Sequence, residues 1–174
     1  MSNTFSEIPS VHQLVYESFK YAKSGDLETA VSMCFDAARS DPENPTIYFV
    51  LGKHLGQQEK HELSSEQFSK SIDLYCKNTN ICPNLFEACY LSSLNFYCLK
   101  QYEKAFKYVD MALDFTPHDS PRYPKYLMHV SAIAFACSKW QEAANIADQV
   151  LQINPGDDMA SLIRQQALLR LARV

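Results

Sequence analysis

Residues 101–117, QYEKAFKYVDMALDFTP, contain a spacing of residues that recurs along the chain. In this stretch Pro117 follows Ala105 by 12 residues, and an aromatic residue, Tyr102, precedes that alanine by three. The same order of a large residue, an alanine and a proline occurs at the same spacing in two other places: Leu27, Ala30 and Pro42, and Trp140, Ala143 and Pro155. A spacing that returns in this way indicates a repeated structural unit.

The period of the repeat is about 34 residues. Ser64 lies 34 residues after Ala30, and Ser71 lies 34 residues after Ala37, which places another copy between these stretches. The steps to the later copies are a few residues longer, and two polar, proline-containing stretches, 79–84 and 119–124, accommodate the difference. A period of about 34 residues is typical of solenoids built from helix-turn-helix units.

These residues resemble the tetratricopeptide repeat family, whose repeat starts with an aromatic residue, Leu-Gly and Tyr and continues with Ala, Phe, Ala and Pro. The best match to the first helix is Tyr48-x-x-Leu51-Gly52-x-x-Leu55. Serines take the place of that glycine in the other copies: Ser18, Ser93 and Ser131. Small residues there let the two helices of a hairpin approach closely. The second copy departs most from the pattern, with Ser64, Ser71 and Cys76 for Ala, Ala and Pro.

The resemblance covers roughly residues 11–155 and implies an all-α fold, a right-handed αα-superhelix of about four helix-turn-helix repeats with a C-terminal capping helix. We expect a flexible leader at 1–10, repeats near 11–44, 45–78, 86–119 and 124–157, and the capping helix at 157–174. Within the second repeat, the charged residues 57–62 are the expected turn. A content of 47% hydrophobic and 21% charged residues argues against disorder, and only four glycines argue against a sheet-rich fold.

The charge and the hydrophobic pattern exclude several classes of partner. A net charge of −4 gives no sign of a surface that binds nucleic acid or an anionic membrane. No apolar run approaches the roughly 18 residues of a membrane-spanning helix. The first ten residues also lack a basic and apolar leader. We therefore expect a cytoplasmic protein that binds neither nucleic acid nor membrane.

The sequence gives no sign of catalytic, cofactor or metal chemistry. It has no glycine-rich phosphate loop and no His-Glu-x-x-His motif, and its five histidines are scattered. None of its six cysteines forms a Cys-x-x-Cys pair: Cys34, Cys76, Cys82, Cys89, Cys98 and Cys137. We interpret them mainly as small buried residues. The alternatives are a metal site with His54 and His61, or a disulfide between Cys76 and Cys82. We expect no catalytic residue, no cofactor and no metal.

Stacked hairpins line their first helices along a concave groove, where side chains have no partner inside the solenoid. The repeat period places three rows there: Val15, Phe49, Tyr90 and Met128; Phe19, Lys53, Leu94 and Ala132; Ala22, Gly56, Tyr97 and Phe135. Together with Lys125, these mostly apolar rows are a candidate site for a protein or peptide segment. We expect Phe49, Tyr90, Tyr97 and Met128 to contribute much of the binding energy. The alternative is that neighbouring helices cover the groove.

These features favour a non-catalytic interaction module, an adaptor or scaffold that binds an apolar or aromatic partner segment. Some family members bind acidic chaperone tails through two lysines, two asparagines and an arginine. The corresponding positions here do not match in either possible frame: Val15, Phe19, Val50, Glu87 and Leu91, or Phe49, Lys53, Leu91, Lys125 and His129. The resemblance also admits a small dedicated chaperone for a secreted or membrane-inserting client. A structural subunit of a larger assembly is a weaker alternative.

The last helix carries more apolar surface than one hairpin can bury. Its apolar residues are Met159, Leu162, Ile163, Ala167, Leu168, Leu169 and Leu171. The alternative is an adequate cap, whose polar face is Arg164, Gln165, Arg170 and Arg173. We expect weak self-association through this helix, with Leu168 and Leu171 in the contact, or a natural chain that continues beyond Val174 with more helix.

Overall fold

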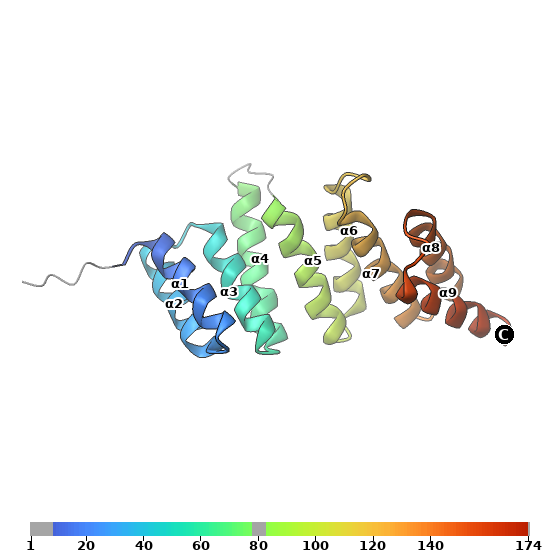
Figure 1. Ribbon diagram of the computed structural model, residues 1–174, viewed down its shortest axis with the longest axis horizontal. Helices are drawn as coiled ribbons and strands as arrows, with labels where there is room; N and C mark the ends of the chain where they lie inside the picture. The colour runs from blue at the N-terminus through green and yellow to red at the C-terminus, as the bar shows by residue number, and fades with distance from the viewer. Residues whose placement is uncertain (1–8, 78–82, 174) are drawn as a thin grey trace, which may run out of the picture. The chain divides into compact units, whose positions relative to one another are not determined.

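A computed structural model describes residues 9–77 and 83–173 of the chain. Over these residues it has nine α-helices and no strand, which confirms the expected all-α fold (Figure 1). The helices form two compact units, an N-terminal unit of four helices and a C-terminal unit of five. Most of the expected leader and Cys82 lie outside the described residues.

The N-terminal unit consists of two helical hairpins. Its helices are α1 (Val11–Lys23), α2 (Leu27–Ser40), α3 (Pro45–Gln57) and α4 (His61–Lys77). Each of the first three starts at a polar N-cap whose side chain accepts a hydrogen bond from a backbone amide of the first turn: Ser10, Asp26 and Asn44. This bond satisfies one of the amides that a helix start leaves unpaired.

The two helices of each N-terminal hairpin meet at small residues. A Cβ atom on Gly52 would lie 2.8 Å from the ring of Phe68, so only glycine fits without a shift. Opposite Gly52, the hydroxyl of Ser64 donates to the Gly52 carbonyl at 2.7 Å. In the first hairpin, Ala30 and Ala37 are completely buried. The small residues of the repeat pattern are therefore the points of closest helix contact.

The C-terminal unit has two hairpins followed by one more helix. Its helices are α5 (Pro83–Cys98), α6 (Tyr102–Asp114), α7 (Tyr123–Ala136), α8 (Trp140–Ile153) and α9 (Asp158–Leu171). The serines that replace the family glycine donate across their hairpins, from Ser93 to the Ala105 carbonyl and from Ser131 to the Ala143 carbonyl. In Figure 1, α9 lies beside α8, and both contribute to one core with α7.

The turns inside the four hairpins share one backbone feature. One residue in each turn has a positive φ, near 60° at Glu59, Lys100 and Ser138 and 90° at Gly25. This conformation reverses the chain within a few residues and costs least at glycine. In the second repeat it shortens the turn, so that α4 starts at His61 instead of at the expected position 64. The expected turn at 57–62 was too long.

Candidate functional site

The four predicted groove residues of the N-terminal unit are not equally accessible. Val15 packs at the edge of a small core formed by Leu14, Ala37 and Ile47. Phe49 is only 5% exposed, since its ring lies 6.0 Å from the ring of Phe68, centroid to centroid. The Lys53 ammonium covers the Phe49 ring at 5.3 Å. We expected the side chains of the three predicted groove rows to have no partner inside the repeats, and this expectation is wrong for Phe49.

Phe19 is the most exposed of these four residues, at 42%. Its ring meets His54 edge-on, with 5.5 Å between the ring centroids. Burial lowers the pKa of His54, whose Nε2 lies 3.2 Å from the hydroxyl of Ser18. That hydroxyl donates to the Val15 carbonyl and is completely buried. The serine–histidine contact therefore packs α1 against α3, and a substrate cannot reach it.

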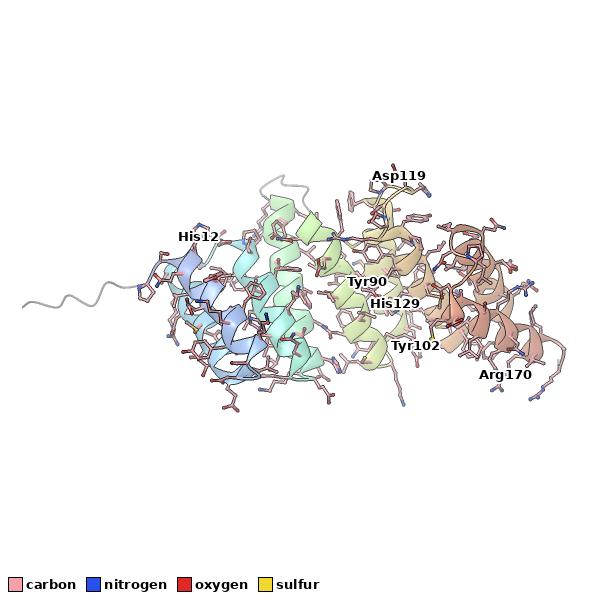
Figure 2. The ribbon with its side chains drawn as sticks, viewed as in Figure 1. His12, Tyr90, Tyr102, Asp119, His129 and Arg170 are labelled. Atoms are coloured by element: carbon pink, nitrogen blue, oxygen red, sulfur yellow. The ribbon has the colours of Figure 1, made fainter. Side chains whose placement is uncertain are left out.

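In the C-terminal unit, a hollow of about 470 Å³ brings together four of the predicted groove residues: Tyr90, Lys125, Met128 and Ala132. Its other lining residues are Pro121, Pro124, His129, Asn154, Asp157 and Met159. These residues come from α5, from α7 and the turn before it, and from the connection between α8 and α9 with the start of α9, so we name this space the α5–α7–α9 hollow. Figure 2 shows Tyr90 and His129 close together, on α5 and α7.

Tyr90 forms one wall of the hollow, but most of its surface is already covered. It is 7% exposed and stacks on Tyr126, with 4.6 Å between ring centroids. The ammonium of Lys125 lies 4.7 Å from the centroid of the Tyr90 ring, within the range of a cation–π contact. Burial raises the pKa of the Tyr90 hydroxyl. Tyr90 is thus a rigid wall rather than the free aromatic anchor that we expected.

His129 is a buried side chain of the hollow that lies outside the three predicted rows. Burial lowers its pKa to about 4, although a hydrogen bond with the Ser93 backbone opposes this shift. Its ring meets Tyr90 and Tyr97 edge-on, each at a centroid distance of 5.5 Å. Its Nε2 has no hydrogen-bond partner among the described residues. The ring is therefore neutral at neutral pH, and this part of the hollow carries no charge.

The remaining predicted residues of this unit lie outside the hollow. The ring of Tyr97 packs against the ring of Tyr102, with 5.6 Å between the ring centroids. Burial raises the pKa of the Tyr97 hydroxyl. Phe135 packs edge-on against Trp140 at 4.9 Å. Leu94 is half-buried. The repeat period placed these side chains on the correct helices, and their neighbours within the hairpins cover much of their surface.

Comparison with known proteins identifies the fold. No family model matches the sequence, and no curated protein matches it either. Among solved structures, the chain is similar to YrrB, described as a TPR protein with an unusual peptide-binding site, at a TM-score of 0.78 and 14% identity over 96% of this chain and 80% of that one. The chain has the tetratricopeptide-repeat fold.

Two further structures have the same tetratricopeptide-repeat fold. One is a putative kinesin light chain of TPR-like repeats from Podosopora anserina, with a TM-score of 0.77 and 12% identity over 96% of this chain and 90% of that one. The other is MamA, with a TM-score of 0.75 and 16% identity over 93% of this chain and 88% of that one. These similarities confirm the fold that the resemblance implied.

Within the tetratricopeptide-repeat fold, α5 and α7 are the first helices of two successive repeats. The helix α9 follows α8 as a further first helix would, which explains why Met159 and Asp157 contribute to the same hollow. A second space of about 420 Å³ is lined by residues from α6, α7 and α8, including Phe106, Ile133 and Cys137. None of the predicted groove residues lines this second space.

The described cysteines have no partner that would form a disulfide. Cys34 and Cys89 are buried, and burial raises the pKa of the Cys34 thiol. Cys76, Cys98 and Cys137 are exposed, so the interpretation of the cysteines as buried residues is wrong for these three. The described residues contain no cluster of three or more histidine, cysteine or acidic side chains suited to a metal ion. Among the same residues, no helix has the length and apolar character needed to cross a membrane.

Proposed function

We propose that this chain is a non-catalytic protein–protein interaction module that binds a segment of a partner protein in the α5–α7–α9 hollow. The observation that supports this most is the hollow itself. It gathers Tyr90, Lys125 and Met128 from the predicted groove and adds Met159, a side chain that is 57% exposed. A hollow with apolar surface and a few polar groups is the usual form of a binding site.

The lining favours an apolar or aromatic partner side chain. Met128, Met159 and Ala132 offer flexible thioethers and a small residue, which adapt to irregular apolar shapes. The cation of Lys125 lies at the Tyr90 ring, and the carboxylate of Asp157 is at another point of the lining. With one cation, one carboxylate and a neutral His129, the hollow has no excess of positive charge for an acidic tail.

The fold supports a binding role. Tetratricopeptide-repeat hairpins stack into extended binding surfaces, and YrrB is described by its peptide-binding site. We propose an adaptor or scaffold that joins this partner to others, in the cytoplasm, without nucleic acid or membrane as a ligand. A dedicated chaperone would use the same hollow but would keep its client soluble. A structural subunit would copurify in fixed proportion with a larger assembly.

The test starts with a pull-down of the full chain from its native source, with the partner identified by mass spectrometry. The affinity of that partner is then measured by calorimetry for the wild type and for Met159→Glu. We expect a loss of about thirtyfold, because removal of an apolar anchor costs about 2 kcal/mol.

The matched control is Leu63→Glu, since Leu63 is 48% exposed and lies on α4, outside the hollow. It should bind as the wild type does. A second variant, Met128→Glu, should also weaken binding while its thermal unfolding shows that the fold persists. A partner that binds Met128→Glu and Met159→Glu as tightly as the wild type would contradict the proposal.

A further inference from the structure

The helix α9 buries one narrow face and leaves large apolar side chains outside. Ala160, Ile163 and Ala167 face α8 and α7 and are almost completely buried. Four larger residues on the same helix are between 42% and 57% exposed: Met159, Leu162, Leu168 and Leu169. Two of the three buried side chains are alanines, so packing against α8 and α7 leaves much of the apolar surface of α9 in contact with water.

Two of these exposed leucines lie on the face directly opposite the buried one. Leu162 and Leu169 are seven residues apart, about two helical turns, and therefore point in nearly the same direction. They share that face with three exposed polar residues of the helix: Asp158, Gln165 and Gln166. The exposed Arg173 lies in the turn two residues after the last residue of α9, at the position that continues this face. We name these six residues the outer strip of α9. Leu168 points to another side of the helix, and Leu171 is half-buried. We therefore expect Leu162 and Leu169, instead of Leu168 and Leu171, to make the contact with a second copy.

The outer strip has a symmetric order of residues. Its centre lies between Gln165 and Gln166, with Leu162 three residues before Gln165 and Leu169 three residues after Gln166. Likewise, Asp158 lies seven residues before Gln165, and Arg173 lies seven residues after Gln166. A two-fold axis through the centre would place Leu162 against Leu169 of a second copy, and Asp158 against Arg173 of that copy. Both pairs would occur twice.

The charges select one orientation for such a pair of helices. In the antiparallel arrangement each carboxylate of Asp158 meets a guanidinium of Arg173, and the leucines meet leucines. In a parallel arrangement Asp158 would face Asp158 and Arg173 would face Arg173, which is unfavourable. Neither Asp158 nor Arg173 has an ion-pair partner among the described residues, whereas Arg164 already pairs with Asp148. The two terminal charges are thus available to a second copy.

We infer that the outer strip of α9 is the interface of an antiparallel homodimer with two-fold symmetry. The contact is isologous, which is the commonest arrangement in protein dimers. One pair of short helices buries at most roughly 1,200 Å², the lower end of specific interfaces, so the dimer is weak and forms at high protein concentration. This inference does not depend on the α5–α7–α9 hollow.

Sedimentation velocity of the full chain from about 10 μM to about 1 mM tests the inference, because a weak dimer appears only in the upper part of this range. The wild type should shift from monomer to dimer. Leu162→Glu with Leu169→Glu should raise the dimer dissociation constant at least about tenfold. Leu168→Glu is the matched control, with similar exposure on the same helix, and should dimerise as the wild type does.

A charge exchange tests the antiparallel register. Asp158→Arg alone and Arg173→Asp alone should each weaken the dimer severalfold, and the two together should restore it to within about twofold, because the pairs form again with opposite polarity. Circular dichroism confirms that each variant keeps its helices. A wild-type chain that stays monomeric, a dimer that survives both leucine changes, or a double exchange that fails to restore the dimer would each overturn the inference.

Discussion

The hydroxyl of Ser131 on α7 donates a hydrogen bond of 2.8 Å to the carbonyl of Ala143 on α8, twelve residues later. Ser131 and Ala143 are both completely buried. We predict that Ser131→Ala destabilises the chain by about 1 kcal/mol, because it removes a hydrogen bond without creating a steric clash. Urea unfolding at neutral pH measures this difference. An unchanged midpoint would show that the bond does not contribute to stability.

Overpacking at the same contact should cost more than loss of the bond. Ala105 and Ala143 have no exposed surface and lie where two helices are closest. We predict that Ala105→Trp or Ala143→Trp destabilises its unit by at least about 1 to 3 kcal/mol, since a large ring cannot enter without moving a helix. Thermal unfolding of these variants at the wild-type temperature would mean that these alanines are not at the hairpin contact.

Substitutions of Gly52 and Gly156 together test how closely α3 and α4 pack. A Cβ atom on Gly52 would lie 2.8 Å from Phe68, whereas on Gly156 its nearest neighbour would be 3.9 Å away. Gly52→Ala should therefore destabilise the fold by about 1 to 3 kcal/mol. Gly156→Ala should be neutral or slightly stabilising. Equal unfolding temperatures for the two variants would contradict the close contact between α3 and α4.

The positive φ angles of the hairpin turns predict stabilising changes. Lys100 and Ser138 have φ near 60°, a conformation that glycine adopts without a steric penalty. Lys100→Gly and Ser138→Gly should each stabilise the chain by up to about 1 kcal/mol. Gly25→Ala, at φ 90°, should destabilise it. Calorimetric melting of the three variants tests this, and the opposite order of melting temperatures would refute it.

His129 should make the folded chain sensitive to mild acid. Its pKa is lowered by burial to about 4 in the folded state, whereas an unfolded histidine titrates near 6.5. The unfolded chain therefore binds the proton first, so this contribution to stability is complete above pH 6.5 and is lost as the pH falls towards 4. The loss is at most about 3 kcal/mol.

The pH dependence is isolated by comparing variants, because carboxylates also titrate in this range. His129→Gln should flatten the fall in unfolding free energy between pH 6.5 and 4. Parallel curves for the wild type and His129→Gln would show that His129 does not remain neutral inside the fold.

The spacing of small residues was enough to predict the helices of this fold. The hairpins could be located from Ala105, Ala143 and Pro117. A close helix contact admits only small side chains, so small residues recur at a fixed spacing in the sequence. The start of α4 was missed because Glu59 adopts a left-handed conformation, which the sequence of a charged stretch does not reveal. A positive φ at a residue other than glycine cannot be recognised from the residue type.

The site was predictable only in part. The period placed Met128 and Lys125 on the face that lines the hollow, but it could not show that Tyr126 would cover Tyr90 by stacking. Such cover depends on side-chain directions in space. Met159 and Asp157 were missed because the rows were built from the four repeats, and α9 follows them without a full repeat of its own. The repeat pattern of the sequence therefore ends before the last residues that line the hollow.

Photo-crosslinking from within the α5–α7–α9 hollow tests the proposed function most directly. Met128 is replaced by a photoreactive phenylalanine in the full chain, and the same residue is placed in a second variant at Phe35, a 45% exposed position on α2. Both variants are irradiated with the partner identified by pull-down, and the adducts are mapped by mass spectrometry. We predict an adduct between the partner and position 128 and none at position 35. An adduct at position 35 without one at position 128 would contradict binding in the hollow.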